Sequence, residues 1–168
     1  MIRFKVYFLL IVLFLYSCSK NDLQNPVNES ELSSTEELLL LSTEVHSPQE
    51  AALFQMINAY RISLNMNPFI FDNVSLYYAK EHSTYMASKG TTSHAKFGKR
   101  AEQISKLSGA EFVAENVAKD YDTIELAFEA WLESNGHRKN IEGDYTHSAV
   151  GIVENEVGDL YFTQLFFR

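Results

Sequence analysis

Between residues 47 and 136, apolar residues recur at the spacing of amphipathic helices in four stretches. At the start of the first stretch, Ser47 can cap a helix and Glu50 can complete a capping box. The second stretch ends at Gly90 and the fourth at Asn135-Gly136, residue types that accept the left-handed conformation after a helix. The expected helices cover residues 48–64, 73–89, 98–108 and 124–134.

Runs of β-branched and aromatic residues predict strands at residues 112–118, 147–154 and 159–167, with a short extended piece at 69–71. Gly158 and Asp159 lie between the last two runs and favour a hairpin turn. The order of the main elements is helix, helix, strand, helix, strand, strand. This order predicts an α+β domain with an antiparallel sheet packed by helices.

Residues 1–17 have the pattern of an export signal, with positive charge at Arg3 and Lys5 followed by a short apolar run. Residues 15–18 resemble a bacterial lipobox, in which Cys18 would become the lipidated first residue. A plain signal peptide with a chance cysteine is the alternative. Cys18 is the only cysteine, so no intramolecular disulfide is possible. The pattern predicts an exported protein anchored to the membrane by lipid.

Residues 18–47 are polar and acidic, and we expect them to form a disordered tether. The folded domain is expected at residues 48–168, with 11 Lys and Arg against 16 Asp and Glu. Because the basic residues form no cluster, nucleic acid is not an expected partner.

Three histidines and one glutamate carry the candidate chemistry. His94 and His137 each follow a predicted helix stop, and Glu115 follows a strand-like run, so the three could converge. Two imidazoles and a carboxylate suit an open zinc site, but they could equally form the polar floor of a cavity. His82 is expected on the core side of its helix, whereas His46, in the tether, is expected to have no role.

Six segments of the chain resemble, in order, the bacterial branch of the CAP superfamily, which includes cysteine-rich secretory, antigen 5 and pathogenesis-related 1 proteins. The likeness covers residues 51–167, and its most specific elements are Glu-Asn-Val-Ala and Gly-His-Arg-x-Asn-Ile. The resemblance implies a three-layer α-β-α sandwich with a central antiparallel sheet and a shallow cleft. The segments begin at His82, Thr92, Glu115, Trp131, Val150 and Tyr161.

In the CAP superfamily, a tetrad of two histidines and two glutamates lines the cleft and binds a divalent metal in several members. The resemblance places His94, Glu115 and His137 in this tetrad, so zinc or another divalent metal is a possible cofactor. The position of the second glutamate holds Ser134 here. The neighbouring Glu133 is expected to face solvent, and His82 either fills the gap or is a hydrogen-bonded core residue.

The resemblance favours a membrane-anchored binding module, with a lipid, a sterol or an extracellular protein as ligand. The alternative is a metal-dependent hydrolase in which Glu115 would be the general base of a zinc-activated water. The expected location is the periplasm or the cell surface. An outer membrane is favoured because Ser19 provides no aspartate retention signal after Cys18.

Overall fold

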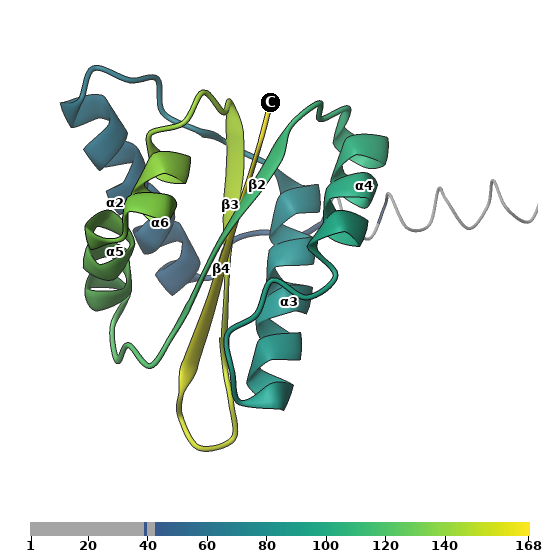
Figure 1. The fold of residues 1–168 in the computed structure, drawn as a ribbon, viewed down its shortest axis with the longest axis vertical. Coiled ribbons are helices and arrows are strands. Elements are labelled where there is room, and N and C mark those ends of the chain that lie inside the picture. Colours follow the sequence, from purple (N-terminus) through teal and green to yellow (C-terminus); the bar gives the residue numbers. More distant parts are fainter. Residues whose placement is uncertain (1–38, 40–42) are drawn as a thin grey trace, which may run out of the picture.

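The computed structural model describes residues 39 and 43–168 and places the helices on both faces of one sheet (Figure 1). Helices α2, α5 and α6 cover one face, and helices α3 and α4 cover the other. This is the α+β, three-layer α-β-α arrangement that the sequence predicts.

None of the helices in the described part of the chain is long and apolar enough to cross a membrane. The predicted signal, lipidation site and most of the tether lie outside the described residues. The helices are α2 (Pro48–Ser63), α3 (Asn73–Lys89), α4 (Phe97–Ser108), α5 (Ile124–Glu133) and α6 (Asn135–Ile141).

The sheet has four strands in the order β1-β3-β4-β2. Strands β3, β4 and β2 are antiparallel, as predicted, whereas the two residues of β1 pair with β3 in parallel. The predicted antiparallel sheet is therefore confirmed, and the short extended piece at residues 69–71 adds a parallel strand at one edge. The chain enters β1 and β3 from two different helices, so no hairpin forces these strands to run in opposite directions. The strands are β1 (Ile70–Phe71), β2 (Val113–Lys119), β3 (His147–Glu154) and β4 (Leu160–Phe167).

The predicted caps form where the sequence places them. Ser47 Oγ accepts from Glu50 N–H, and Ser47 N–H donates to the Glu50 carboxylate at 2.7 Å, which completes the capping box of α2. Asp72 caps α3, and Gly90 ends it with φ of 66°. These local signals fix the helix that carries His82.

The fourth predicted helix ends within one residue of its expected end, but Asn135-Gly136 does not form the expected left-handed stop. Helix α5 stops at Glu133, Ser134 is extended with ψ of 116°, and Asn135 begins the new helix α6. Gly136 is not among the described glycines with positive φ. Arg138 donates to the carbonyl of Leu132 at 2.6 Å, so this carbonyl in the last turn of α5 has a hydrogen-bond partner. His137 therefore lies in a short helix and not on a loop.

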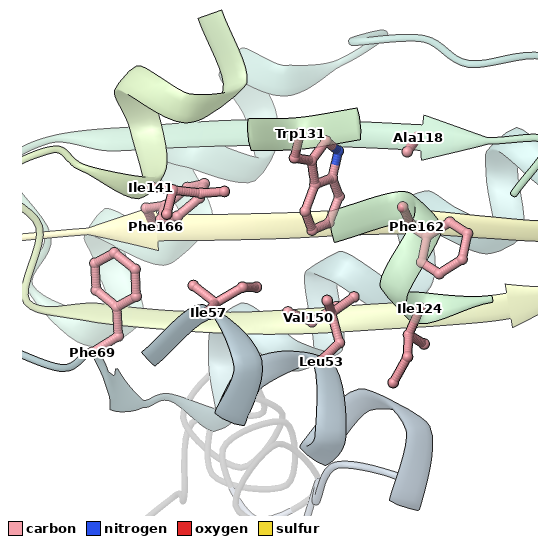
Figure 2. Close-up of a cluster of buried hydrophobic side chains, with 11 residues drawn as sticks. Leu53, Ile57, Phe69, Ala118, Ile124, Trp131, Ile141, Val150, Phe162 and Phe166 are labelled. Atoms are coloured by element: carbon pink, nitrogen blue, oxygen red, sulfur yellow. The ribbon is translucent and has the colours of Figure 1, made fainter. Parts of the chain in front are cut away.

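The main core lies between the sheet and the layer formed by α2, α5 and α6. Figure 2 shows Trp131 and Ile141 from the helices above Phe162 and Phe166 of β4. The indole N–H of Trp131 donates to the carbonyl of Val117 at 3.3 Å, so the ring is both packed and fixed in direction. This contact holds α5 against the outer edge of β2.

Candidate functional site

Glu115 lies at the centre of the candidate site, on the face of the sheet that α3 and α4 cover. It pairs across the sheet with Leu165, which packs in the cluster beneath α4. Its side chain is 2% exposed. Arg100 of α4 binds it bidentately, with Nε 2.9 Å from Oε2 and Nη2 2.9 Å from Oε1. The charge of this buried carboxylate is therefore matched by a guanidinium in the preferred geometry.

His94 contacts the same carboxylate from the loop between α3 and α4. Its Nδ1 lies 2.9 Å from Glu115 Oε1, and its side chain is 58% exposed. A carboxylate only accepts hydrogen bonds, so Nδ1 carries the proton and Nε2 of the neutral ring has a free lone pair. Glu115 thus orients His94 from behind, in the manner of a partner that fixes a histidine tautomer.

His82 is a buried, hydrogen-bonded histidine in α3. Its Nε2 donates to the carbonyl of Ser93 at 2.5 Å and lies 3.8 Å from Glu115 Oε1. Burial lowers the pKa of His82, more than the neighbouring Glu115 raises it, so the ring stays neutral. The bond to Ser93 fixes the residue immediately before His94. His82 is therefore buried and hydrogen-bonded, and its contact with Ser93 holds the loop of His94.

His137 lies beyond the outer edge of β2, in α6. Asn116 Nδ2 donates to the carbonyl of His137 at 3.1 Å, and Asn140 Nδ2 donates to Asn116 Oδ1 at 2.9 Å. Burial, and secondly the charge of His94, lower the pKa of His137. His94 is therefore near enough for its charge to act on His137.

The predicted ligands are divided by the alternation of β2. Glu115 points to the α3 and α4 layer, whereas its neighbour Asn116 contacts α6, because successive strand residues face opposite sides. His137 is therefore reached through Asn116 and not through Glu115. In the described part of the chain, no group of three or more His, Cys, Asp or Glu is arranged to hold a metal ion. With its carboxylate committed to Arg100, Glu115 does not fit the role of a third ligand in this arrangement.

A cleft of about 320 Å³ opens beside the outer edge of β2. Ser134 lines it at the position where the resemblance expects a second glutamate, and Glu133 is exposed on the far side of α5. The cleft thus brings together His137, Ser134 and the loop residue Thr92, with His94 coupled to His137 electrostatically. Its lining residues are Thr92, Val117, Ala118, Lys119, Asp120, Tyr121, Ala130, Trp131, Ser134 and His137.

Arg100 is the site residue that the sequence reasoning missed. The signal that could have found it is its spacing, since Arg100 precedes Ile104 and Leu107 by four and seven residues. It therefore lies on the stripe of α4 that faces the sheet, and it is buried. A charge on the buried stripe of a helix requires a buried partner.

The layer order and the placement of the two motifs agree with the family that the sequence resembles. The chain belongs to the CAP family, the cysteine-rich secretory protein family, whose model matches residues 54–166.

Two proteins of Bacillus subtilis (strain 168) are similar in sequence. The uncharacterized protein YkwD is 30% identical over 113 residues, which cover 65% of this chain and 44% of YkwD. The uncharacterized membrane protein YlbC is 28% identical over 130 residues, which cover 74% of this chain and 36% of YlbC. The matched region thus spans less than half the length of either relative.

Two solved structures share the fold. An outer surface protein from Borrelia burgdorferi has a TM-score of 0.66 and 21% identity, over 74% of this chain and 96% of that chain. An extracellular protein containing a SCP domain from Bacillus anthracis str. Ames has a TM-score of 0.63 and 24% identity, over 75% of this chain and 45% of that chain. At these identities the similarity shows the fold alone.

Proposed function

We propose that this chain is an exported, membrane-anchored CAP protein that works as a binding module at the cell envelope. Three comparisons support the location, since similar proteins are named as an outer surface protein, an extracellular protein and a membrane protein. The pattern of residues 1–18 supports export followed by attachment of lipid to Cys18.

The observation that favours binding over hydrolysis is the state of Glu115. A general base must reach a proton of the substrate or of a bound water. The carboxylate of Glu115 is instead 2% exposed and already accepts hydrogen bonds from Arg100 and His94. It therefore serves as a buried anchor for the walls of the cleft.

The cleft suits a small ligand with a polar group attached to an apolar part. Thr92, Ser134 and His137 supply hydroxyl and imidazole groups, while Tyr121 and Ala130 supply apolar surface. Its volume of about 320 Å³ lies at the lower end of small-molecule sites. We assign to it a lipid-like ligand, of which the polar head would enter the cleft.

A metal-dependent hydrolase is the second candidate, and one observation favours it. Nδ1 of His94 is held by a carboxylate, which leaves Nε2 directed away from Glu115, as in metal-binding histidines. His94 and His137 are the residues that would hold a zinc ion, and the ion would supply an activated water.

Calorimetry separates the two candidates. A soluble chain of residues 19–168 is titrated with zinc and, separately, with a short-chain phospholipid below its micelle concentration. A binding module is expected to bind the phospholipid, and His137→Ala is expected to weaken this binding about tenfold. The control is His147→Ala, since His147 stacks on Phe167 outside the residues that line the cleft. Zinc binding that both His94→Ala and His137→Ala abolish, without phospholipid binding, would instead support the hydrolase.

A separate experiment tests the anchor. When the full chain is expressed in a bacterium that processes lipoproteins, it is expected in the membrane fraction. Cys18→Ala is expected to release it into the soluble fraction, because the chain then has no residue to accept the lipid. Retention of Cys18→Ala in the membrane would refute lipid attachment at this residue and leave the binding experiment unaffected.

A further inference from the structure

Residues 44–47 lie against the domain as an extended strap directly before α2. Their side chains alternate, with Glu44 and His46 partly buried and Val45 and Ser47 exposed. Glu44 is held by α3, because its carbonyl accepts from Asn73 Nδ2 at 2.8 Å and its carboxylate lies 3.0 Å from Lys80 Nζ. The contacts of the domain thus begin before the predicted boundary at residue 48, and His46 has structural contacts that the sequence reasoning did not expect.

His46 accepts the hydrogen bond of one backbone amide at the free edge of β3. The amide of Val150 in β3 donates to Nε2 of His46 at 3.2 Å. The imidazole also packs between two aromatic rings, with centroids 4.5 Å from Phe71 of β1 and 5.1 Å from Phe54 of α2. A side chain therefore takes the place that a neighbouring strand would occupy.

Glu50 accepts the hydrogen bond of the next outward-facing amide along the same edge. The amide of Ile152 donates to Glu50 Oε1 at 2.9 Å, while Glu50 Oε2 accepts from Ser47 N–H at 2.7 Å. Lys80 reaches this carboxylate from α3, with Nζ 3.8 Å from Oε2. The edge is thus covered by polar groups from the strap and from both helical layers.

Backbone groups of β3 beyond Ser148 have no partner strand among the described residues on this edge because β1 is short. Strand β1 pairs with His147 and Ser148 only, and no other described strand lies on that side of β3. The amides of Val150 and Ile152 would otherwise be free, and free edge amides invite pairing with another chain. The two acceptors differ in location, however, since Glu50 belongs to α2 whereas His46 lies on the strap.

We propose that residues 44–47 are an acid-releasable strap, in which neutral His46 holds the free edge of β3 closed. The hydrogen bond from Val150 requires an unprotonated Nε2. When Nε2 is protonated, its N–H faces the N–H of Val150 and the hydrogen bond is lost. The charged groups around the ring are Glu44 on the strap, Glu50 on α2 and Lys80 on α3, while β1 and β3 contribute Phe71 and backbone atoms. Protonation of His46 therefore breaks the contact between the strap and β3.

The pKa of His46 sets the pH range in which the strap is released. Burial, and secondly the charge of Lys80, lower the pKa of His46 from 6.5 to about 4. The strap is therefore closed at neutral pH and opens as the pH falls through about 4. Release adds four residues, roughly 13 Å of extended chain, between α2 and the N-terminal segment. If that segment carries the proposed anchor, acid lengthens the reach of the domain from the membrane.

Amide hydrogen exchange tests the strap directly, with the full chain in detergent micelles and exchange followed by NMR. At pH 7, His46→Ala is expected to lower the protection of the Val150 amide roughly tenfold, because one hydrogen bond is lost. Ile152, held by Glu50, is expected to stay protected in the same variant. His46→Gln is the matched control, since its side-chain oxygen can accept the same hydrogen bond and does not titrate.

The pH dependence gives a second readout. Wild-type protein is expected to lose the protection of Val150 between about pH 5 and about pH 3.5, whereas His46→Gln keeps it. Protection of Leu165, in the centre of the sheet, separates strap release from global unfolding. Equal protection of Val150 in wild type and His46→Ala at pH 7, or identical pH profiles for wild type and His46→Gln, would overturn the proposal. Neither result depends on whether the cleft binds a ligand.

Discussion

At the scale of single residues, the ion pair between Arg100 and Glu115 has a large energetic consequence. Both side chains are buried, at 9% and 2% exposure, and the pair is closed further by the Ala95 carbonyl, which accepts from Arg100 Nη1 at 2.7 Å. A buried pair of this kind contributes little net stability when it is complete. Removal of one partner is costly because the other charge then stays buried without compensation.

The expected cost can be measured by chemical denaturation. Arg100→Met should lower the free energy of unfolding by about 3 kcal/mol, since the buried carboxylate of Glu115 would lose the guanidinium that matches it. Lys99→Met is the control, because Lys99 is exposed on the same helix. Its effect should stay within about 0.5 kcal/mol. The double variant Arg100→Met with Glu115→Gln should recover part of the loss, and no recovery would argue against a buried-charge origin.

At the scale of elements, a close backbone contact joins α3 to the sheet at Gly151 of β3. A Cβ placed on Gly151 would overlap the backbone of α3, with the carbonyl carbon of Ala79 only 2.5 Å away. The helix can approach this closely because glycine has no side chain there. Ser83, one turn further along α3, fixes the contact by donating to the Gly151 carbonyl at 2.9 Å. The position of His82 over Glu115 therefore depends on a glycine in another element.

Two glycine substitutions test this account. Gly151→Ala should destabilise the protein by about 2–3 kcal/mol, because backbone atoms of α3 cannot move without loss of packing. Gly136→Ala should instead be neutral or stabilise by about 0.5–1 kcal/mol, since alanine favours a helix. A Cβ on Gly136 would have no neighbour within 4 Å. Equal effects of the two variants in thermal unfolding would contradict the close-contact explanation.

At the scale of the whole molecule, three histidines make stability depend on pH. Burial is the largest cause that lowers the pKa of His46, His82 and His137 below the ordinary value of 6.5. The unfolded chain therefore binds more protons than the folded chain below that pH. The stability due to these neutral rings is fully present above pH 6.5 and is lost as the pH falls below it.

Urea unfolding at pH 7.5, 5.5 and 4.5 measures this dependence. The free energy of unfolding is expected to decrease from the first value to the last. The variant His46→Gln should decrease less steeply, because one of the three titrating groups is absent. A stability that stays constant or rises towards pH 4.5 would contradict the lowered pKa values.

The whole molecule also extends beyond the predicted domain boundary. A chain that starts at residue 48 lacks Ser47, which caps α2, and the strap contacts of Glu44 and His46. Compared with a chain that starts at residue 43, it should lose about 2 kcal/mol of unfolding free energy. Denaturant titrations of the two chains give this difference, and equal midpoints would show that the strap contributes nothing.

The sequence by itself determined the elements and the family. Helix caps at Ser47 and Gly90, strand runs at the C-terminal end, and the two motifs around Glu115 and His137 are local signals, so they can be read from neighbouring residues. These signals were sufficient for the α+β layers and for the presence of His94 and Glu115 in one site. They failed at Asn135-Gly136, where contacts of Arg138 and Ile141 with other residues override the stop signal.

The tertiary structure alone decided how the site residues are connected. Arg100 joins Glu115 across 15 positions, and His46 joins Val150 across 104, so no local pattern relates the partners. The alternation of β2 then places Glu115 and the contact to His137 on opposite faces. Hydrogen bonds and ion pairs between distant segments form only when the layers pack, and for that reason the chemistry of the cleft follows from the fold and not from the motifs.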